Sequence, residues 1–430
     1  MAKYEIKDGI AIIPEGTQEI DEFAFFRSKE LTYVTIPDSV TEIGERAFFG
    51  CSALMEIKVA EGNPKYDSRK NCNAIIETAR NKLIVGCKST NIPDSVTEIE
   101  EWAFSDCSGL LSVVIPDSVT EIGAGAFFGY SALTEIKVAE GNPKYDSRKN
   151  CNAIIETARN KLIVGCKSTN ILDSVTEIGE RAFSGCKELI SVVIPDSVTE
   201  IGEAAFFRCK ELTSVVIPDS VTKIGDSAFS WCESLPSVTI PNSVTEIEDS
   251  AFSWCKNLSS VTIPDSVTEI GEMAFLGCER LTSVVIPDSV TKIGKGAFAG
   301  CDSLTSVTIP NSVTEIGEWA FSDCSGLSSV VIPDSVTEIG EGAFLRCENL
   351  TSVVIPDSVT EIGEGAFSEC DSLETITLGP NIDKIHTEVF SSCSALKTIF
   401  VPAKKTDYYK NRLPENLHSL IVEFEPIKKQ

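Results

Sequence analysis

The chain has 430 residues, of which 42% are hydrophobic and 23% are charged, and this balance excludes a disordered or collagen-like protein. Its 64 Asp and Glu outnumber its 37 Lys and Arg, and the formal net charge of −27 makes nucleic acid and anionic membrane surfaces poor partners. No run of eighteen apolar residues occurs, so we expect no membrane insertion. The N-terminus lacks the apolar segment of a secretory signal, which predicts a cytoplasmic location for the chain as written.

Residues 1–30 are predicted to form an N-terminal cap together with the first repeat unit. Tyr4–Ile6 alternates in hydrophobicity, as expected of a strand that covers the apolar end of a stacked array. Residues 31–403 then follow a single pattern. Cysteines recur every 23 residues from Cys186 to Cys393, and a leucine stands three positions after each of them. A fixed period of this length is typical of a solenoid.

One repeat unit is numbered from its leucine, so that Leu350 is position 1 of its unit. Positions 3 to 6 alternate between polar and apolar residues and predict a short strand, which the proline at position 7 ends because it has no N–H to donate. Ile362, Ala366 and Cys370 then recur at i, i+4 and i+8, which predicts a short helix or 3-10 segment. A unit this small cannot bury its own apolar side, so we expect the units to stack with their strands in parallel.

The pattern Cys-x-x-Leu-x-x-Val-x-Ile-Pro-x-x-Val-x-x-Ile-Gly-x-x-Ala-Phe resembles the 23-residue leucine-rich repeat of BspA-like proteins over nearly the whole chain. The resemblance implies an α/β solenoid: a right-handed coil with a concave parallel β-sheet and short helical or 3-10 return segments. It also implies bacterial or protist surface proteins that bind other proteins, including host matrix components. A cell-surface or secreted location would follow if the N-terminus had been trimmed.

Two units depart from the period, at residues 54–86 and 133–165, where each is ten residues longer than the others. Glu56–Ile92 recurs without change as Glu135–Ile171, which indicates a duplication of this block. Within the first copy, 73–77 and 82–86 alternate around a turn, which predicts an inserted β-hairpin. We expect both hairpins to protrude from the solenoid, either as contact arms for a partner or as tolerated insertions.

Residues 404–430 are predicted to form the C-terminal cap. Lys404–Leu413 is expected to be a helix carrying Tyr408 and Tyr409, and Leu420–Phe424 a closing strand. Such a cap is needed because a solenoid exposes an apolar cross-section at each end.

Little in the sequence indicates catalysis or a cofactor. The repeated cysteines are expected to be reduced, buried thiols, although stacked neighbours would be close enough for some bonds under oxidising conditions. His386 and His418 lie near the end of the chain, so a zinc site and a histidine-activated nucleophile are not expected within the repeats. Acidic columns at positions 8 and 12 offer oxygen ligands for Ca²⁺, but a turn cap and a solvated edge explain them more simply. We therefore predict neither enzyme activity nor a bound metal or cofactor.

Recognition is most readily sought where the units differ from one another. Positions 16, 19 and 20 vary, and all four tryptophans fall there: Trp102 and Trp319 at position 16, Trp231 and Trp254 at position 20. Met273 joins them at position 16. Exposed aromatic residues are enriched in protein interfaces, whereas the alternative is that these rings pack sideways on the next coil.

The strand face is nearly uniform, with Ser followed by Val or Thr at positions 3 and 5. Departures lie in the first third of the chain, at Tyr33, Lys58 and Lys137, and we include these three as candidate partner contacts. A uniform face suits an extended partner or multivalent binding more than a single small ligand.

The function expected from the sequence is that of a non-catalytic scaffold that binds a partner protein with a basic surface, through the sheet face or the tryptophan-bearing edge. The alternative is a structural solenoid that associates with itself through its hairpins or its ends. A surface that reads a regular lattice, such as ice or a polysaccharide, is a third hypothesis, which the alternation of Thr with Val disfavours.

Overall fold

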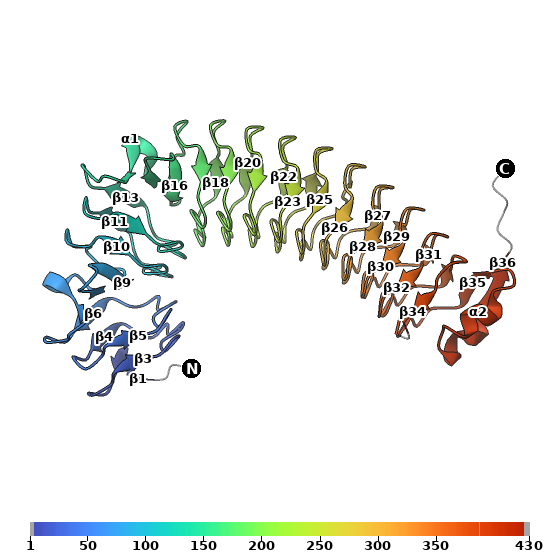
Figure 1. The fold of residues 1–430 in the computed structure, drawn as a ribbon, viewed down its shortest axis with the longest axis horizontal. Coiled ribbons are helices and arrows are strands. Elements are labelled where there is room, and N and C mark those ends of the chain that lie inside the picture. Colours follow the sequence, from blue (N-terminus) through green and yellow to red (C-terminus); the bar gives the residue numbers. More distant parts are fainter. Residues whose placement is uncertain (1–3, 387, 425–430) are drawn as a thin grey trace. The chain divides into compact units, whose positions relative to one another are not determined.

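The computed structural model describes residues 4–386 and 388–424. The chain divides into two compact units, Met1–Leu212 and Thr213–Gln430. Both are parallel β-solenoids in which most coils contribute one short strand to a first sheet and one to a second sheet, as the stacked arrows of the yellow-to-red coils show (Figure 1). The expected solenoid is therefore confirmed.

The first sheet is formed by positions 3 to 6 of each coil. In the first unit its strands are β2 (Ile10–Ile12), β4 (Tyr33–Ile36), β6 (Glu56–Val59), β11 (Ser112–Ile115), β13 (Glu135–Val138) and β18 (Ser191–Val193). In the second unit they are β20 (Ser214–Val216), β22 (Ser237–Thr239), β24 (Ser260–Thr262), β27 (Ser306–Thr308), β29 (Ser329–Val331), β31 (Ser352–Val354), β33 (Thr375–Thr377) and β35 (Thr398–Pro402). Val353 and Ile355 are buried while Val354 is 64% exposed, so the predicted alternation is confirmed.

The second sheet, at positions 12 and 13, was not predicted. Its strands in the first unit are β3 (Glu19–Ile20), β5 (Glu42–Ile43), β10 (Glu98–Ile99), β12 (Glu121–Ile122), β17 (Glu177–Ile178) and β19 (Glu200–Ile201). In the second unit they are β21 (Lys223–Ile224), β23 (Glu246–Ile247), β25 (Glu269–Ile270), β26 (Lys292–Ile293), β28 (Glu315–Ile316), β30 (Glu338–Ile339), β32 (Glu361–Ile362) and β34 (Lys384–Ile385). Ile362 therefore lies in a strand and not in the helical segment to which its spacing had assigned it.

The return segment, positions 15 to 21, differs from the expected continuous helix. It retains the i→i+3 hydrogen bond of a 3-10 helix only at alternate residues, as in Leu345 N to Gly342 O at 3.0 Å. The residues between donate to the next coil instead, as in Phe344 N to Ala366 O at 2.8 Å and Arg346 N to Ser368 O at 2.9 Å. Alternation of this kind places positions 16 and 20 in the left-handed region, with φ of 57° at both Gly342 and Arg346.

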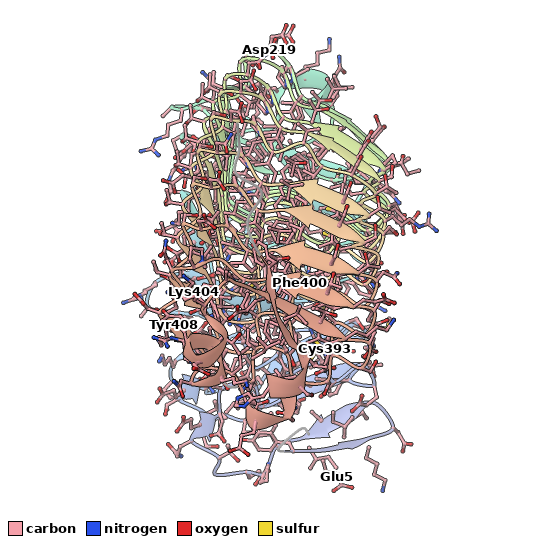
Figure 2. All side chains as sticks on the ribbon, turned by 90° about the vertical axis from the view of Figure 1, so that its right-hand side faces the viewer. Glu5, Asp219, Cys393, Phe400, Lys404 and Tyr408 are labelled. Atoms are coloured by element: carbon pink, nitrogen blue, oxygen red, sulfur yellow. The ribbon has the colours of Figure 1, made fainter. Side chains whose placement is uncertain are left out.

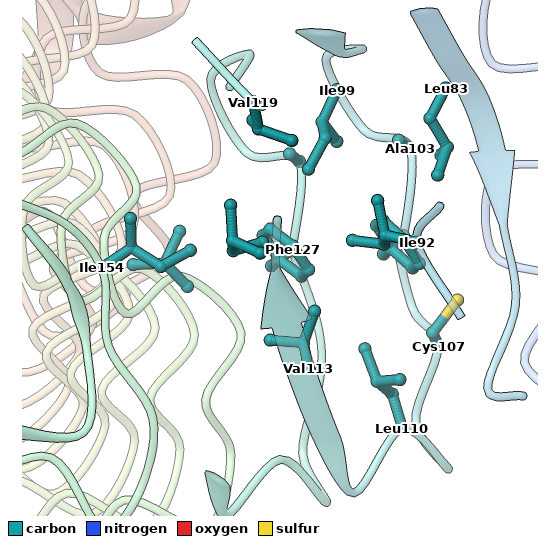
Figure 3. Close-up of a cluster of buried hydrophobic side chains, with 14 of the residues drawn as sticks. Leu83, Ile92, Ile99, Ala103, Cys107, Leu110, Val113, Val119, Phe127 and Ile154 are labelled. Carbon is teal, nitrogen blue, oxygen red and sulfur yellow. The ribbon is translucent and has the colours of Figure 1, made fainter. Parts of the chain in front are cut away.

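Phenylalanine rings at position 18 and thiols at position 21 fill the interior. In the second unit the rings of Phe275, Phe298 and Phe321 stack with centroids 5.3 and 5.5 Å apart. Most ladder thiols donate to the carbonyl oxygen of a phenylalanine in the preceding coil, as Cys347 Sγ does to Phe321 O at 3.2 Å, whereas Cys107 donates to Gly86 O. Every cysteine of the chain is free, and all but the half-buried Cys393 are buried, as predicted. Figure 3 shows the corresponding core of the first unit.

The two inserts form the predicted hairpins, but the prediction that these hairpins protrude from the solenoid was wrong. The first contains β7 (Tyr66–Asp67), η1 (Arg69–Asn71), β8 (Ala74–Glu77) and β9 (Lys82–Gly86), and the second contains β14 (Tyr145–Asp146), α1 (Arg148–Cys151), β15 (Ile154–Glu156) and β16 (Lys161–Val164). β8 pairs antiparallel with β9, which pairs in parallel with β10, so the hairpin is part of the second sheet. Ile75, Ile76 and Leu83 are fully buried, and the adjacent Ile75 and Ile76 belong to two different hydrophobic clusters, so residues of β8 contribute to the core on both sides.

The described parts of the two terminal segments pack on the outermost coils of their units. At the N-terminus, β1 (Glu5–Lys7) pairs antiparallel with β2, and the Tyr4 ring stacks on Phe25 at 5.3 Å. At the C-terminus, α2 (Thr406–Lys410) and η2 (Glu415–Leu420) lead to β36 (Ile421–Phe424), which pairs in parallel with β35. Tyr409 is fully buried, and its hydroxyl bonds Gly379 O. Figure 2 shows this helical cap around Lys404 and Tyr408, in front of the stacked coils.

Candidate binding surfaces

The candidate residues on the strand face pair with their own neighbours. Lys58 Nζ lies 2.7 Å from Glu56 and 5.5 Å from the centre of the Tyr33 ring. The hydrogen bond that Lys58 donates to the Glu56 carboxylate raises the pKa of Lys58. Lys137 makes the matching pair with Glu135 at 2.5 Å. These lysines therefore do not form an uncompensated basic patch on a strongly acidic chain.

The tryptophans of the second unit lie half-buried on the return segments, where their rings cover the next coil. Trp231 and Trp254 stack with centroids 5.0 Å apart and an interplanar angle of 19°. A Cβ on Gly277 would lie 2.8 Å from the Trp254 ring, and one on Gly342 would lie 3.3 Å from Trp319. Sideways packing thus accounts for one face of each ring, which leaves the other parts of the rings available to line a surface.

Trp254, Met273 and Trp319 line a single trough of about 710 Å³ on the return face of the second unit. Its floor is formed by Gly277 at position 20 of one coil and by Gly296, Ala299 and Gly300 at positions 16, 19 and 20 of the next coil, which carries almost no side chain there. Trp254 and Trp319 stand at positions 20 and 16 of coils three apart, roughly 14 Å at the spacing of parallel strands. The trough is therefore a gap in the side-chain layer, bounded along the stack by the two indoles.

Carboxylates border the trough on both sides. Glu279 and Asp302 line one side, and Glu318 and Glu341 line the other. Burial raises the pKa of Asp302, and the charges of Glu279, Asp323 and Glu348 raise it further. The part of the pKa shift that comes from these three carboxylates reflects the negative charge along the border, because neighbouring negative charges oppose ionisation.

Two lysines already neutralise part of this border. Lys295 Nζ lies 2.7 Å from Glu318, and Lys256 Nζ lies 2.6 Å from Glu279. The remaining negative charge beside aromatic walls suits a cationic group, since an indole face attracts cations within about 6 Å of its centre.

Trp102 belongs to the first unit and lines a different cavity, of about 490 Å³. Its ring contacts Phe49 and Phe128 with centroids 5.7 and 5.4 Å apart, and the guanidinium groups of Arg46 and Arg181 each lie 5.3 Å from its centre. Its Nε1 is buried without a hydrogen-bond partner. Trp102 is thus not among the residues that line the trough.

The sequence located the tryptophans but not the trough or the cavity. A signal for the trough was present, because Gly277, Gly296 and Gly300 stand at the variable positions between Trp254 and Trp319. Reading the variable positions for the absence of side chains, and not only for aromatic residues, would have found it.

Within residues 4–386 and 388–424, no helix has both the length and the apolar character needed to span a membrane. The same residues contain no group of three or more Cys, His, Asp or Glu side chains arranged to hold a metal ion. The ring of His418 lies 3.0 Å from Leu413 O and so serves the C-terminal cap.

Comparison with known proteins identifies the family. The model of the BspA type leucine rich repeat region matches residues 9–73, 82–156, 160–282, 268–397 and 323–419, which is nearly the whole chain. This chain belongs to the BspA-type leucine-rich repeat family. Repeat proteins of this family generally serve as non-enzymatic scaffolds.

Solved structures of other leucine-rich repeat proteins are similar to this BspA-type chain. A leucine-rich repeat protein from Bacteroides ovatus is 27% identical, with a TM-score of 0.52 over 84% of this chain and 98% of the other. A leucine rich cell surface protein from Faecalibacterium prausnitzii is 26% identical, with a TM-score of 0.43 over 91% of this chain and 85% of the other. No curated protein matches this chain.

Proposed function

We propose that this BspA-type protein is a non-catalytic scaffold that binds a partner protein, with the trough of the second unit as its recognition surface. The trough between Trp254 and Trp319 carries this proposal, because it joins two indoles, a side-chain-free floor and a carboxylate border. The occupant is an extended segment of the partner that presents an Arg or Lys side chain to the trough.

Charge and shape both favour a basic segment. The chain carries a net charge of −27, which speeds the approach of a cationic partner at low ionic strength. The floor of glycine and alanine admits a side chain between the indoles without displacing any protein side chain. Apolar contact with Met273 and the two indoles would then accept the aliphatic stem of the arginine or lysine.

A plugging substitution tests the trough directly. In Gly300→Trp the new indole would lie on the floor, and the fold accepts it because Trp231 and Trp254 occupy the same position with φ of 62° and 58° against 67° at Gly300. A fluorescein-labelled peptide of alternating arginine and glycine is titrated into the full chain by anisotropy. Its glutamate counterpart shows how much signal is nonspecific.

The expected result is saturable binding of the arginine peptide and at least about tenfold weaker binding to Gly300→Trp, a loss of about 1.4 kcal/mol. Gly365→Trp is the matched control, since Gly365 also has a left-handed φ of 61° but does not line the trough. Equal binding by the wild type and Gly300→Trp would contradict the proposal and leave the general acidity of the chain as the cause.

Self-association is the second candidate function. One of the two regions expected to mediate it, the pair of hairpins, does not protrude. The hairpins expected to mediate it are buried in the second sheet through β9 and β16. Light scattering across a range of protein concentrations tests association through the ends of the solenoid. A mass that stays at that of one chain disfavours an assembling solenoid.

A further inference from the structure

The two hairpin coils share an unusual feature, which is a glycine at the position of the ladder phenylalanine. Gly86 N donates to Ala103 O at 2.8 Å and Gly165 N donates to Ala182 O at 2.9 Å, as the phenylalanine amides do in the other coils. The next phenylalanine after Gly86 is Phe104, only 18 residues later instead of the usual 23. Each hairpin coil therefore lacks a phenyl ring and part of its return segment, which leaves space beside the coil that precedes it.

In the second copy this space is filled by Tyr130. The residue stands at a ladder position where cysteine is usual, and it is only 1% exposed. Its hydroxyl donates to Gly165 O and lies 3.0 Å from Ala182 O, and its ring meets the edge of Phe127 at 6.4 Å. A phenol group thus replaces the missing ring and uses two carbonyl oxygens of the shortened region.

In the first copy the same place is held by Cys51, 79 positions earlier in the sequence. Here lies the cavity of about 490 Å³. The counterparts of the Tyr130 contacts, which are Phe48, Gly86 and Ala103, all line it, and so does Cys51 itself. The first copy therefore presents the ring wall and the backbone of the Tyr130 site without the phenol.

Two ion pairs involve charged residues that line this cavity, while Lys65, Glu77 and Glu101 also belong to its lining. Arg46 Nε lies 3.3 Å from Glu45, and Lys82 Nζ lies 2.6 Å from Glu100. In each of these two pairs the charges compensate one another, so neither pair requires a charged ligand. Each carbonyl oxygen has two lone pairs, so Ala103 O can accept a second hydrogen bond in addition to the one from Gly86 N.

We propose that this cavity binds a small neutral phenol. Its ring packs against Phe48, and its hydroxyl donates to the carbonyl oxygens of Gly86 and Ala103, as Tyr130 does in the other copy. This site is separate from the trough and does not depend on the proposed function. Phe48 offers an aromatic wall to the ring, and the two acceptors add a preference for the hydroxyl.

The probe is 4-methylphenol, which is the tyrosine side chain as a free molecule, titrated into the full chain by ligand-observed NMR and calorimetry. We expect one saturable site in the wild type. Toluene, which keeps the ring and lacks the hydroxyl, should bind about fivefold more weakly if one net hydrogen bond is lost. Absence of saturable binding at millimolar 4-methylphenol would overturn the proposal, and toluene of equal affinity would overturn the role of the carbonyl acceptors.

Two reciprocal variants tie the binding to this place. Cys51→Tyr should fill the cavity from within and weaken binding of 4-methylphenol at least about tenfold. Tyr130→Cys should open the second copy, lower its thermal midpoint and regain part of the loss when 4-methylphenol is added. Unchanged binding by Cys51→Tyr, or a Tyr130→Cys midpoint that 4-methylphenol does not raise, would refute the use of Tyr130 as a template.

Discussion

Single residues at positions 16 and 20 carry an unusual backbone conformation. Trp102, Trp231, Trp254 and Trp319 all have left-handed φ between 58° and 62°, although bulky residues rarely adopt it. The hydrogen bonds between coils impose this conformation, because every second N–H group of the return segment must point toward a carbonyl oxygen of the next coil. Variability at these two positions in the sequence therefore reflects an outward-facing site whose backbone favours glycine but does not require it.

Exchange of residues between coils should show the cost of this conformation. Ser250 has φ of 55° and Gly365, at the same position of another coil, has φ of 61°. We expect Ser250→Gly to raise the unfolding free energy by up to about 1 kcal/mol, because the left-handed penalty of a residue with a Cβ is removed. Gly365→Ser should lower it by a similar amount.

Urea denaturation followed by circular dichroism measures both changes. The two substitutions lie in the same unit of the chain, and they exchange the same two residue types in opposite directions. Changes of the same sign in both variants would show that the surroundings of the two sites matter more than φ.

At the scale of elements, the strand of the first sheet was predictable because its alternation has period 2 and ends at a proline. The second sheet was not, because two residues are too few to show a period, and Ile362 fits helical spacing equally well. The hairpins were predictable as hairpins. Their place in the core was not, because Lys82 and Leu83 take the places of Glu and Ile in the second sheet only once β9 is paired with β10.

Hydrogen exchange separates an integrated hairpin from a protruding one. The amides of β8 and β9 should exchange as slowly as those of β10, because both strands are paired on either side and Ile75, Ile76 and Leu83 are fully buried. The exposed tip at Ala79 and Arg80 should exchange fast.

The second copy provides an internal comparison for this measurement. β15 pairs with β16, which pairs in parallel with β17, as β8, β9 and β10 do, so β15 and β16 should show the same protection as β8 and β9. Rapid exchange throughout both hairpins would contradict their integration into the second sheet and would favour flexible, protruding arms.

The candidate site was predictable only in part, because the sequence shows single residues but not how the coils bring them together. Trp254, Met273 and Trp319 were identified because aromatic and large apolar residues at variable positions attract notice. Their assembly into one trough depends on the left-handed backbone, which aligns positions 16 and 20 along the stack, and on the small residues of the coils between. Tyr33, Lys58 and Lys137 remain predicted contacts that pair locally on the strand face.

Over the whole molecule, the buried thiols make stability depend on alkaline pH. Burial raises the pKa of Cys255 and of Cys324 from 9.0 to about 12. Between these values the thiols of the unfolded chain lose their protons while those of the folded chain keep them. The folded state then binds more protons, so the unfolding free energy falls as pH rises, by about 1.4 kcal/mol per pH unit for each thiol. Below pH 9 the same thiols contribute no slope.

Cys255→Ala combined with Cys324→Ala isolates this effect from the other groups that titrate above pH 9. Relative to wild type, we expect the decline of unfolding free energy between about pH 9.5 and 10.5 to be shallower by about 3 kcal/mol per pH unit, since two thiols no longer ionise on unfolding. Urea titrations in a reducing buffer at several pH values measure the slope. The variant should also be less stable at pH 7, where two small cavities replace the sulfur atoms. If both proteins declined with the same slope, the thiols would already be ionised in the folded state, and the interior of the solenoid would have to admit water.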